Sequence, residues 1–494
     1  MTDKTPEATS SDYEAMAPYW RMVSAILGGT ETMRAGGQTY LPKFEHESKA
    51  CYDTRLASAK FTNIFSDIVD TLASKPFEKE LVIEKSDAVD DLIEDIDGQG
   101  NHIHVFGAGM FHSGVSDAIT WALIDYTADV PQGATRAAEQ ALGARPYWVN
   151  IPASNMLAVY SETIGGREVI THARYREDAK ERDGFDEVVR KRVRVLQREV
   201  VYDETGKAMS AGAATWELYE KQKDATDAKE KWVSISSGVY SIGIIPLVPF
   251  ITGRRLGSSW VIRPALQSAA HLQIEHYQQE SELKYMRQRT AFAMLAGNGV
   301  EPATDEQGNP KPVPTGPFSV LYAPPGSDGK NGSWEILEPS GSSLEFCSKE
   351  VDKTEAQLRE LGRQPLTAQS GNITTITAAF AGDKAHTVIE AWALNFKDFL
   401  ENCLKITAMW RGSQIEPEVQ VNTDFALSLR EDTGASNLDA ARGRGDISHE
   451  TWFDEMKRRG IIGPNRTFEE ENKRLIEEMP GDPTANDLAD ALTA

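Results

Sequence analysis

The sequence has few cysteines, no phosphate-binding loop and no long apolar run, and each absence argues against a class of protein. Its three cysteines, Cys51, Cys347 and Cys403, lie far apart and form no CxxC pair. We interpret them as small buried residues of a reducing compartment. No GxxxxGK[ST] sequence is present, which argues against a motor ATPase. No run approaches about 18 uncharged apolar residues, so the sequence predicts no membrane-spanning helix.

Basic residues are also scarce relative to acidic ones. The 494 residues include 52 Lys and Arg against 75 Asp and Glu, a formal net charge of −23. Neutralising phosphates requires a basic surface, so this balance argues against a protein that wraps tightly on nucleic acid, but not against one that handles DNA without gripping it. The first residues, MTDKTPEATSSDYEAM, lack the apolar core of a signal peptide, which predicts a soluble protein made in a cytoplasm.

Three short motifs resemble enzyme signatures but are incomplete. GAGMFHSG has His112 where a dinucleotide-binding loop needs its third glycine, and HETWF has Phe453 where HExxH needs its second zinc ligand. His102 and His104 could share a strand face near His112, yet no carboxylate at ligand spacing supports a metal, so a structural or surface role is favoured. No GxSxG elbow or recognisable nucleophilic cysteine motif occurs. We therefore predict no catalytic residue, metal or cofactor, and no enzyme.

Hydrophobic periodicity and turn residues divide the chain into helical and β-rich segments. Apolar residues three and four apart predict helices over 46–74 and about 101–119. Short β-branched and aromatic segments, separated by turn clusters such as DETGK, predict an antiparallel β region over 147–255. The strongest amphipathic pattern predicts a helix over 386–410, and a strand is expected over 416–425.

Two long polar helices flank a segment rich in proline and glycine. The first is predicted over 264–297, roughly 50 Å at 1.5 Å per residue. Seven of the 23 prolines fall between Pro302 and Pro325, and short strands are expected at 317–323 and 333–338. The second polar helix is expected over 342–362. A helix as long as the first needs a buried face, and its apolar stripe is thin.

Near the C-terminus, residues 437–460 predict a helix, a tight Gly-Asp turn and a second helix. Ser448 is a suitable N-cap, and basic residues lie at the end of the second helix. A helix-turn-helix DNA reader would have a similar pattern. However, Glu450, Asp454 and Glu455 would crowd a recognition helix with negative charge. A structural helical hairpin is therefore the favoured interpretation, and DNA reading is the alternative.

Several short strings occur in an order that indicates a family. They are Met33-Arg34 with Gly36-Gly37 and Tyr40-Leu41-Pro42; Tyr52-x-x-Arg55 followed by Phe61 and Asn63; Ile245-Pro246 with Val248-Pro249-Phe250; Asn422 with Asp424-Phe425; and Gly445-x-Ile447-Ser448-x-Glu450-Thr451 running to Lys457-Arg458-Arg459-Gly460. Together with the order of predicted elements, they resemble the portal proteins of tailed bacteriophages, the head-to-tail connectors. The resemblance extends from about Tyr19 to Glu478, and the shared order is stronger than any single string.

The resemblance implies an α+β portal fold with a helical and β wing, a two-helix stem, a small β-containing clip, a long amphipathic helix and a helical crown. It assigns the chain as follows: 1–12 disordered N-terminus, 13–262 wing, 263–298 first stem helix, 299–338 clip, 339–363 second stem helix, 364–377 tunnel loop, 378–425 long wing helix and strand, 426–480 crown helices and 481–494 flexible tail. Disordered insertion is the alternative for the clip, and an ordinary interhelix loop is the alternative for the tunnel loop.

The resemblance also implies a function. Twelve subunits would form a ring at one capsid vertex, the channel through which terminase packages the genome and through which DNA exits. Its partners would be copies of itself, non-specifically passing double-stranded DNA, the terminase large subunit, the major capsid protein or scaffold, and head-completion or tail adaptor proteins, with no membrane. It would be made in the host bacterial cytoplasm and reside in the virion. The alternative is a non-ring minor capsid or scaffold-associated head protein.

Candidate site residues follow from this assignment. The tunnel loop would present short uncharged side chains to a moving duplex, from Gln369, Ser370, Gly371, Asn372, Thr374 and Thr375. Stem candidates for lining the channel are Lys284, Arg287, Lys349 and Lys353, with ion pairing to Glu280, Glu345 and Glu350 as the alternative. Clip candidates for docking terminase are Phe318, Tyr322 and Trp334. A helix in a ring needs only narrow seams, and Leu266, Ala270, Ile274 and Tyr277 are expected to meet a neighbouring copy. The alternative is a surface helix that packs over the core of a monomer.

Overall fold

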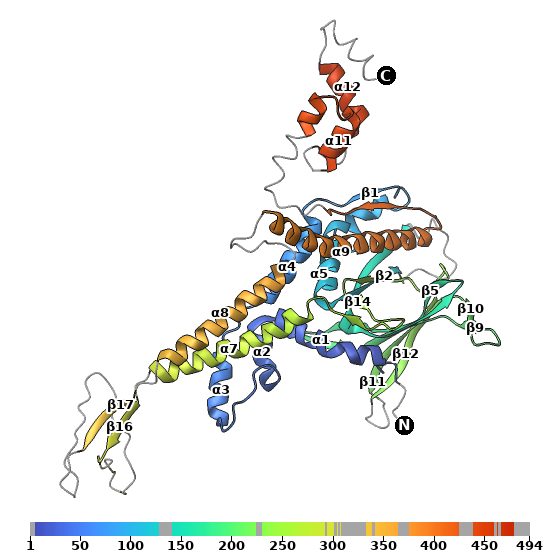
Figure 1. Ribbon diagram of the computed structural model, residues 1–494. Coiled ribbons are helices and arrows are strands. Elements are labelled where there is room, and N and C mark those ends of the chain that lie inside the picture. The colour runs from blue at the N-terminus through green and yellow to red at the C-terminus, as the bar shows by residue number, and fades with distance from the viewer. Residues whose placement is uncertain are drawn as a thin grey trace. The chain divides into compact units, whose positions relative to one another are not determined.

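The computed structural model divides the chain into two compact units (Figure 1). Unit 1 comprises Met1–Trp20, Val69–Ala265 and Gln364–Ala494, and unit 2 comprises Arg21–Ile68 and Leu266–Arg363. Both helices and sheets contribute, in agreement with the expected α+β class. The structure describes residues 5–127, 141–223, 230–291, 294–300, 304, 307, 332–337, 341–363, 375–423, 438–458, 462 and 466–478.

An antiparallel three-stranded sheet packs against two helices in unit 1. The strand order is β13 (Leu247–Ile251), β2 (Ile119–Tyr126) and β3 (Pro146–Pro152), and the helices are α5 (Ile103–Asp117) and α9 (Thr375–Trp410). Phe396 of α9 lies between Phe111 of α5 and Phe250 of β13, with ring centroids 5.3 and 5.0 Å away. Helix α5 approaches β13 closely because residue 114 is glycine, where a Cβ would lie 2.4 Å from the Phe250 ring. These aromatic contacts join three segments far apart in the sequence.

A second, five-stranded antiparallel sheet confirms the predicted β region. Its order is β12 (Glu230–Val239), β11 (Thr215–Lys223), β8 (Arg192–Gln197), β5 (Arg167–Arg176) and β4 (Met156–Ile164). Three small pairs accompany it: β6 (Ala179–Asp183) with β7 (Asp186–Arg190), β9 (Val200–Tyr202) with β10 (Ala208–Ala211), and β14 (Arg254–Arg255) with β15 (Ile262–Arg263). Consecutive strands mostly pair with one another, as expected where turn clusters separate short strands.

A charged cluster connects the two sheets of unit 1. Arg194 of β8 donates hydrogen bonds to Asp125 of β2 at 2.6 Å and to Glu177 at 2.8 Å. Its guanidinium also lies over the Trp216 ring, 5.1 Å from the centroid. A buried guanidinium needs such compensation, because an unpaired charge in this position would be costly.

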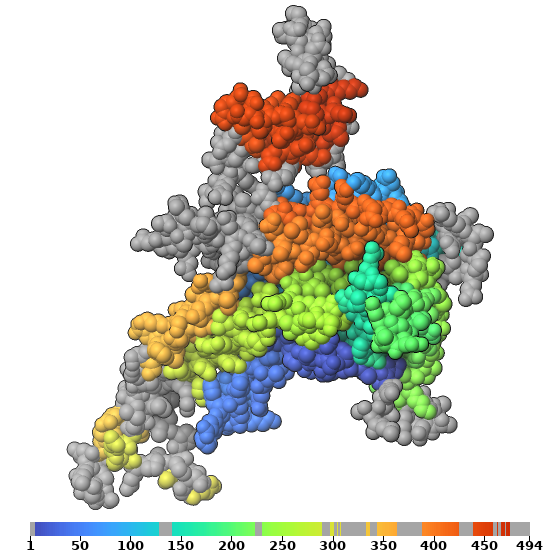
Figure 2. All heavy atoms as spheres, turned by 45° about the vertical axis from the view of Figure 1, so that its right-hand side comes forward, coloured from blue at the N-terminus to red at the C-terminus, as the bar shows by residue number. Residues whose placement is uncertain are grey.

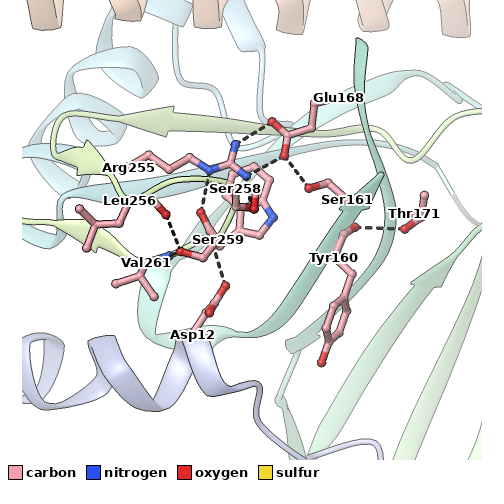
Figure 3. Close-up of polar contacts among 11 residues, drawn as sticks. Asp12, Tyr160, Ser161, Glu168, Thr171, Arg255, Leu256, Ser258, Ser259 and Val261 are labelled. Atoms are coloured by element: carbon pink, nitrogen blue, oxygen red, sulfur yellow. Dashed lines mark hydrogen bonds and ion pairs between the residues drawn. The ribbon is translucent and has the colours of Figure 1, made fainter. Parts of the chain in front are cut away.

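Regular structure begins closer to the N-terminus than the sequence predicted. Helix α1 (Ser11–Leu27) begins inside the segment 1–12 that was expected to be disordered, and the Ser10 amide donates to the Leu157 carbonyl at 3.0 Å. Figure 3 shows Asp12 accepting a 2.7 Å hydrogen bond from the Trp260 amide. The same loop is held by Arg255, which pairs with both carboxylate oxygens of Glu168 at 2.6 and 2.7 Å. Long-range contacts therefore order residues 5–12, which local sequence patterns do not report.

Unit 2 contains the two long polar helices and the helices that precede α4. Its elements are α2 (Gly29–Ala35), α3 (Lys49–Ser58), α7 (Gln267–Ala291), β16 (Met294–Asn298), β17 (Ser333–Leu337) and α8 (Gly341–Arg363), and α4 (Ile64–Ser74) begins here. The single helix predicted over 46–74 is thus two helices. Asn63 causes the restart, because its side-chain oxygen caps α4 by accepting the Ser66 amide at 3.1 Å.

The first polar helix is shorter than predicted. It ends at Ala291 rather than at 297 or 298, and Met294–Asn298 instead forms a strand that pairs with Ser333–Leu337. The predicted strand at 333–338 is confirmed, but its partner comes from the assigned stem segment; the other predicted strand, 317–323, lies outside the described residues. The second polar helix, predicted over 342–362, spans Gly341–Arg363.

Helix α9 confirms the amphipathic pattern with one correction. The amphipathic pattern places Val388, Trp392, Phe396, Phe399, Cys403, Ile406 and Trp410 on one face of the helix. Four of them, Trp392, Phe396, Phe399 and Cys403, are buried, whereas Ile406 and Trp410 are partly buried and Val388 is 44% exposed. The helix begins at Thr375, so the last residues assigned to the tunnel loop are helical. After α9, strand β18 (Glu418–Gln420) pairs with β1 (Val82–Glu84), within the predicted strand segment.

The helix, turn and helix predicted over 437–460 are confirmed, because residues 438–443 are helical and a second helix follows a turn. This second helix, α11 (His449–Arg458), is capped by the Ser448 hydroxyl, which accepts the Thr451 amide at 3.1 Å. Phe453, the residue that interrupts the zinc-like motif, packs edge-on against Phe468 of the following helix α12 (Phe468–Glu478) with centroids 5.6 Å apart. Its role is apolar packing between α11 and α12.

We predict that Phe396→Ala destabilises unit 1 by about 3–5 kcal/mol, because it leaves a cavity among three aromatic rings. Chemical unfolding followed by tryptophan fluorescence measures the loss. Leu394→Ala on the same helix, where the side chain is 48% exposed, is the control and should change stability by about 0.5 kcal/mol or less. Equal losses for the two variants would contradict this account of the core.

Candidate functional site

Helix α7 lies between α3 on one side and α8 on the other (Figure 1). We call these three helices the shaft. Toward the α3 side, the Tyr277 ring of α7 meets Phe61 edge-on, with centroids 5.5 Å apart. Toward α8, Met286 contacts Cys347 with sulfur atoms 3.7 Å apart. A helix with a thin apolar stripe is therefore covered on two opposite sides by its own chain.

This arrangement corrects the predicted seam between neighbouring copies. Leu266, Ala270 and Tyr277 are buried within the single chain, and only Ile274 is partly exposed. Three of the four seam residues are therefore covered without a second copy. The cover of Tyr277 comes from Phe61, more than two hundred positions earlier, and a local pattern cannot report such a contact.

Arg55 of α3 organises the segment that covers α7. Its guanidinium pairs with both carboxylate oxygens of Glu47 at 2.9 and 3.0 Å and donates to the Pro42 carbonyl at 2.7 Å. It lies over the Phe44 ring, 4.0 Å from the centroid, and reaches Ser281 of α7 at 3.4 Å. The hydrogen bond from Arg55 lowers the pKa of the Glu47 carboxyl. The string Tyr52-x-x-Arg55 was the only sequence signal for this pair.

Polar residues of α7 are buried because backbone groups satisfy them. The Gln273 side chain donates to the Thr62 carbonyl and accepts from the Phe65 amide, both at 2.9 Å. Gln278 donates to the Tyr40 carbonyl at 2.9 Å. Each bond fixes α7 against an irregular stretch of the earlier segment. Buried amides that are fully paired cost little and specify one register of packing.

His276 differs from Gln273, because its polar atoms, like the buried Tyr277 hydroxyl, have no hydrogen-bond partner. It is 1% exposed, and neither ring nitrogen has a hydrogen-bond partner. The nearest carboxylate, Glu280, is 4.0 Å away and is itself bound by Lys60 at 3.2 Å. Glu355 and Arg359 of α8 also face the ring. Burial lowers the pKa of the imidazole.

The candidate channel cations occupy different surroundings. Lys284 donates to the Ser58 carbonyl of α3, whereas Arg287 is exposed on α7. Lys349 pairs with Glu345 at 2.7 Å and Lys353 with Glu350 at 3.5 Å, while their side chains stay 71% and 61% exposed. The structure thus places the last two together on the outer surface of α8. Lys284 does not pair with Glu280, the partner that the sequence suggested.

The other candidate residues are only partly described. Gln369, Ser370, Gly371, Asn372, Thr374, Phe318 and Tyr322 lie outside the described residues, and Thr375 is the first residue of α9. Trp334 of β17 lies opposite Gly297 of β16, where a Cβ would stand 3.2 Å from the indole. The glycine therefore makes room for the tryptophan ring at this two-stranded tip.

The described histidines have structural surroundings. His102 caps α5 by accepting the His104 amide at 3.1 Å, and His112 lies 3.1 Å from Asp70. Within the described ranges, no group of three or more His, Cys, Asp or Glu side chains could hold a metal ion. Among the described helices, none combines the length and apolar character needed to cross a membrane.

Comparison with known proteins gives a family match that includes α7, α8 and α9 but not α3. Residues 266–411 match the family described as "Domain of unknown function (DUF4055)", from just before α7 to just after α9. No curated protein matches the sequence. The chain is similar to a chain in the neck of a native gene transfer agent (GTA) particle, at 13% identity and a TM-score of 0.40, over 81% of this chain and 89% of the other.

Two further solved structures are similar over comparable lengths. One is from the virion of a native gene transfer agent particle, at 12% identity and a TM-score of 0.39, over 86% of this chain and 97% of the other. Another is from the neck of an empty particle, at 12% identity and a TM-score of 0.40, over 78% of this chain and 87% of the other.

We predict that the Arg55–Glu47 pair behaves as a unit. Removing one partner, as in Arg55→Met or Glu47→Met, leaves a buried charge unpaired and should cost about 3–5 kcal/mol. The double variant should cost less than the sum of the single variants, because no lone charge remains. Urea unfolding of the four proteins gives the coupling free energy, and additive losses would contradict it.

We predict that the shaft loses stability in mild acid through His276. Its folded-state pKa is lowered from an unfolded value near 6.5. The neutral ring therefore contributes stability above about pH 6.5, and this contribution is lost as pH falls through the folded pKa. The thermal midpoint of the wild type should fall further between pH 7.5 and 5.5 than that of His276→Gln. His46→Gln is the exposed control and should follow the wild type.

Proposed function

We propose that this protein is a portal, the head-to-tail connector of a tailed bacteriophage or related particle, and that it acts as a ring of identical subunits. One observation carries the proposal: two long polar helices, α7 and α8, run side by side and are joined through a two-stranded tip of β16 and β17. A β-rich body precedes this hairpin in the sequence, and a long amphipathic helix and a helical hairpin follow it. This is the order of wing, stem, clip, wing helix and crown in portals.

Helix α8 has the two sides expected of a helix that borders water on one side and a neighbouring subunit on the other. Along α8, Val351, Thr354 and Leu358 are buried, whereas charged side chains such as Lys349 and Lys353 stay exposed. Portal stem helices need this division between a packed side and a wet side.

The charge of the chain supports a channel that DNA passes without binding. Twelve subunits would carry 12 × (−23) = −276 formal charges. An acidic, water-lined channel repels phosphates, so the duplex is not bound preferentially at any one position along the channel. Exposed cations on α8 have glutamates one turn away, which weakens their attraction for phosphate. In this function the ring meets terminase during packaging, the capsid protein or scaffold around it, and head-completion or tail adaptor proteins afterwards.

Mass decides between this proposal and a non-ring head protein. A ring of twelve would have a mass of 12 × 54.5 = 654 kDa, against 54.5 kDa for one chain. We expect native mass spectrometry to show a closed oligomer near the larger value, and axial electron-microscopy views to show a central hole. Protein that stays monomeric from low to tens of micromolar would overturn the proposal.

A further inference from the structure

The imidazole of His276 is enclosed by three elements of unit 2. They are α7 itself, helix α8, and the irregular residues 59–63 between α3 and α4, which we call the connector. Figure 2 shows the surface of α7 (yellow-green) between the surfaces of α3 (blue) and α8 (orange). The ring is 1% exposed, and neither nitrogen has a hydrogen-bond partner among the described residues. A charged imidazole enclosed in this way would lose its hydration without gaining a hydrogen bond.

The charged groups around the ring are already paired with one another. On α7, Glu280 lies 4.0 Å from the ring and accepts hydrogen bonds from Lys60 at 3.2 Å and from the Thr62 hydroxyl at 3.1 Å. On α8, Glu355 faces the ring and accepts a hydrogen bond from Arg359 at 3.0 Å. Two carboxylates are thus balanced by two cations. Because neither carboxylate is left without a cation, the enclosed ring favours its neutral form.

Side chains of α7 hold the connector in place. Gln273 donates to the Thr62 carbonyl and accepts from the Phe65 amide just after the connector, both at 2.9 Å. Lys284 donates to the Ser58 carbonyl just before it. No residue of the connector belongs to a helix or strand, so few backbone hydrogen bonds of its own resist its opening.

Helix α8 is attached to α7 in a different way, by apolar packing over several turns. Val351 and Leu358 are buried, and Cys347 contacts Met286 of α7. Apolar side chains on one regular helix leave their partner together, which costs more free energy than moving a short irregular segment. The connector is therefore the element that can leave the ring at the lowest cost.

We propose that the connector and His276 form an acid-sensitive switch, in which the connector covers α7 while the imidazole is neutral and is released when the imidazole takes up a proton. Burial lowers the pKa of the enclosed imidazole, whereas an exposed imidazole has a pKa near 6.5. Proton uptake therefore favours the state with the exposed ring as pH falls below about 6.5. The inference goes beyond a loss of overall stability in acid, because it names the element that opens. It concerns a single subunit and does not rest on the proposed ring.

Hydrogen–deuterium exchange of the full-length protein, read by mass spectrometry, tests the inference. Peptides that cover residues 59–66 report on the connector, because its release breaks the bond between the Phe65 amide and Gln273. Labelling times are scaled to the intrinsic exchange rate at each pH. Between pH 7.5 and 5.5 we expect the opening constant of these peptides to rise several-fold, and by at most about tenfold, the limit for one group with an exposed pKa near 6.5. Peptides of α8, and of β2 in unit 1, should keep their protection.

Two variants show whether His276 is responsible. His276→Gln keeps a polar side chain that takes up no proton, so its connector should exchange equally at both pH values. His46→Gln replaces an exposed histidine and should behave like the wild type. Circular dichroism shows whether His276→Gln folds. If it does not fold, the wild type still provides a test, because its opening constant should rise below about pH 6.5 with the uptake of no more than one proton.

Three results would overturn the inference. The first is a wild-type connector whose protection does not change with pH. The second is a loss of protection as large in His276→Gln as in the wild type, which would assign the effect to another group. The third is an equal loss in the α8 peptides, which would mean that the shaft opens as a whole. None of these results changes the mass of the assembly, so the portal proposal is tested separately.

Discussion

The structure of the shaft depends on one constraint: a long helix with few apolar residues must be covered from two sides by its own chain. Tyr277 and Gln273 of α7 face the segment before α4, while Met286 faces α8. The cover is mostly polar and is stable because backbone carbonyls and amides satisfy the buried side chains. Arg55 and Glu47 hold that covering segment together. Without this ion pair we expect the segment to cover α7 less well, so that the buried polar side chains of α7 are exposed to water and the helix loses its fixed position.

The same constraint separates the internal surfaces of the shaft from those left for a partner. Three of the four α7 residues that a ring neighbour was expected to cover are already buried within the single chain.

Unit 1 is built on a different principle, with ordinary apolar packing. Rings from α5, β13 and α9 meet in one cluster, and the Arg194 cluster ties the two sheets. Such a body changes little when surface residues change, whereas the shaft depends on a few buried polar contacts. His276 is buried without a hydrogen-bond partner, and we expect protonation of its ring in acid to destabilise the shaft.

The sequence by itself determined the elements whose signals are local. Local patterns predicted helices α8 and α11 nearly to their ends, the C-terminal part of α9, and the antiparallel β region, because these signals come from residues a few positions apart. Only the tertiary structure decided what covers α7, where the helix over 46–74 breaks, and that Met294–Asn298 pairs as a strand. Each of those outcomes depends on contacts across tens to hundreds of residues: Gln273 with Thr62, Arg55 with Ser281, and Gly297 opposite Trp334. A pattern along the chain cannot report which distant backbone groups will satisfy a buried amide, so the connector and its place beside His276 became visible only after folding.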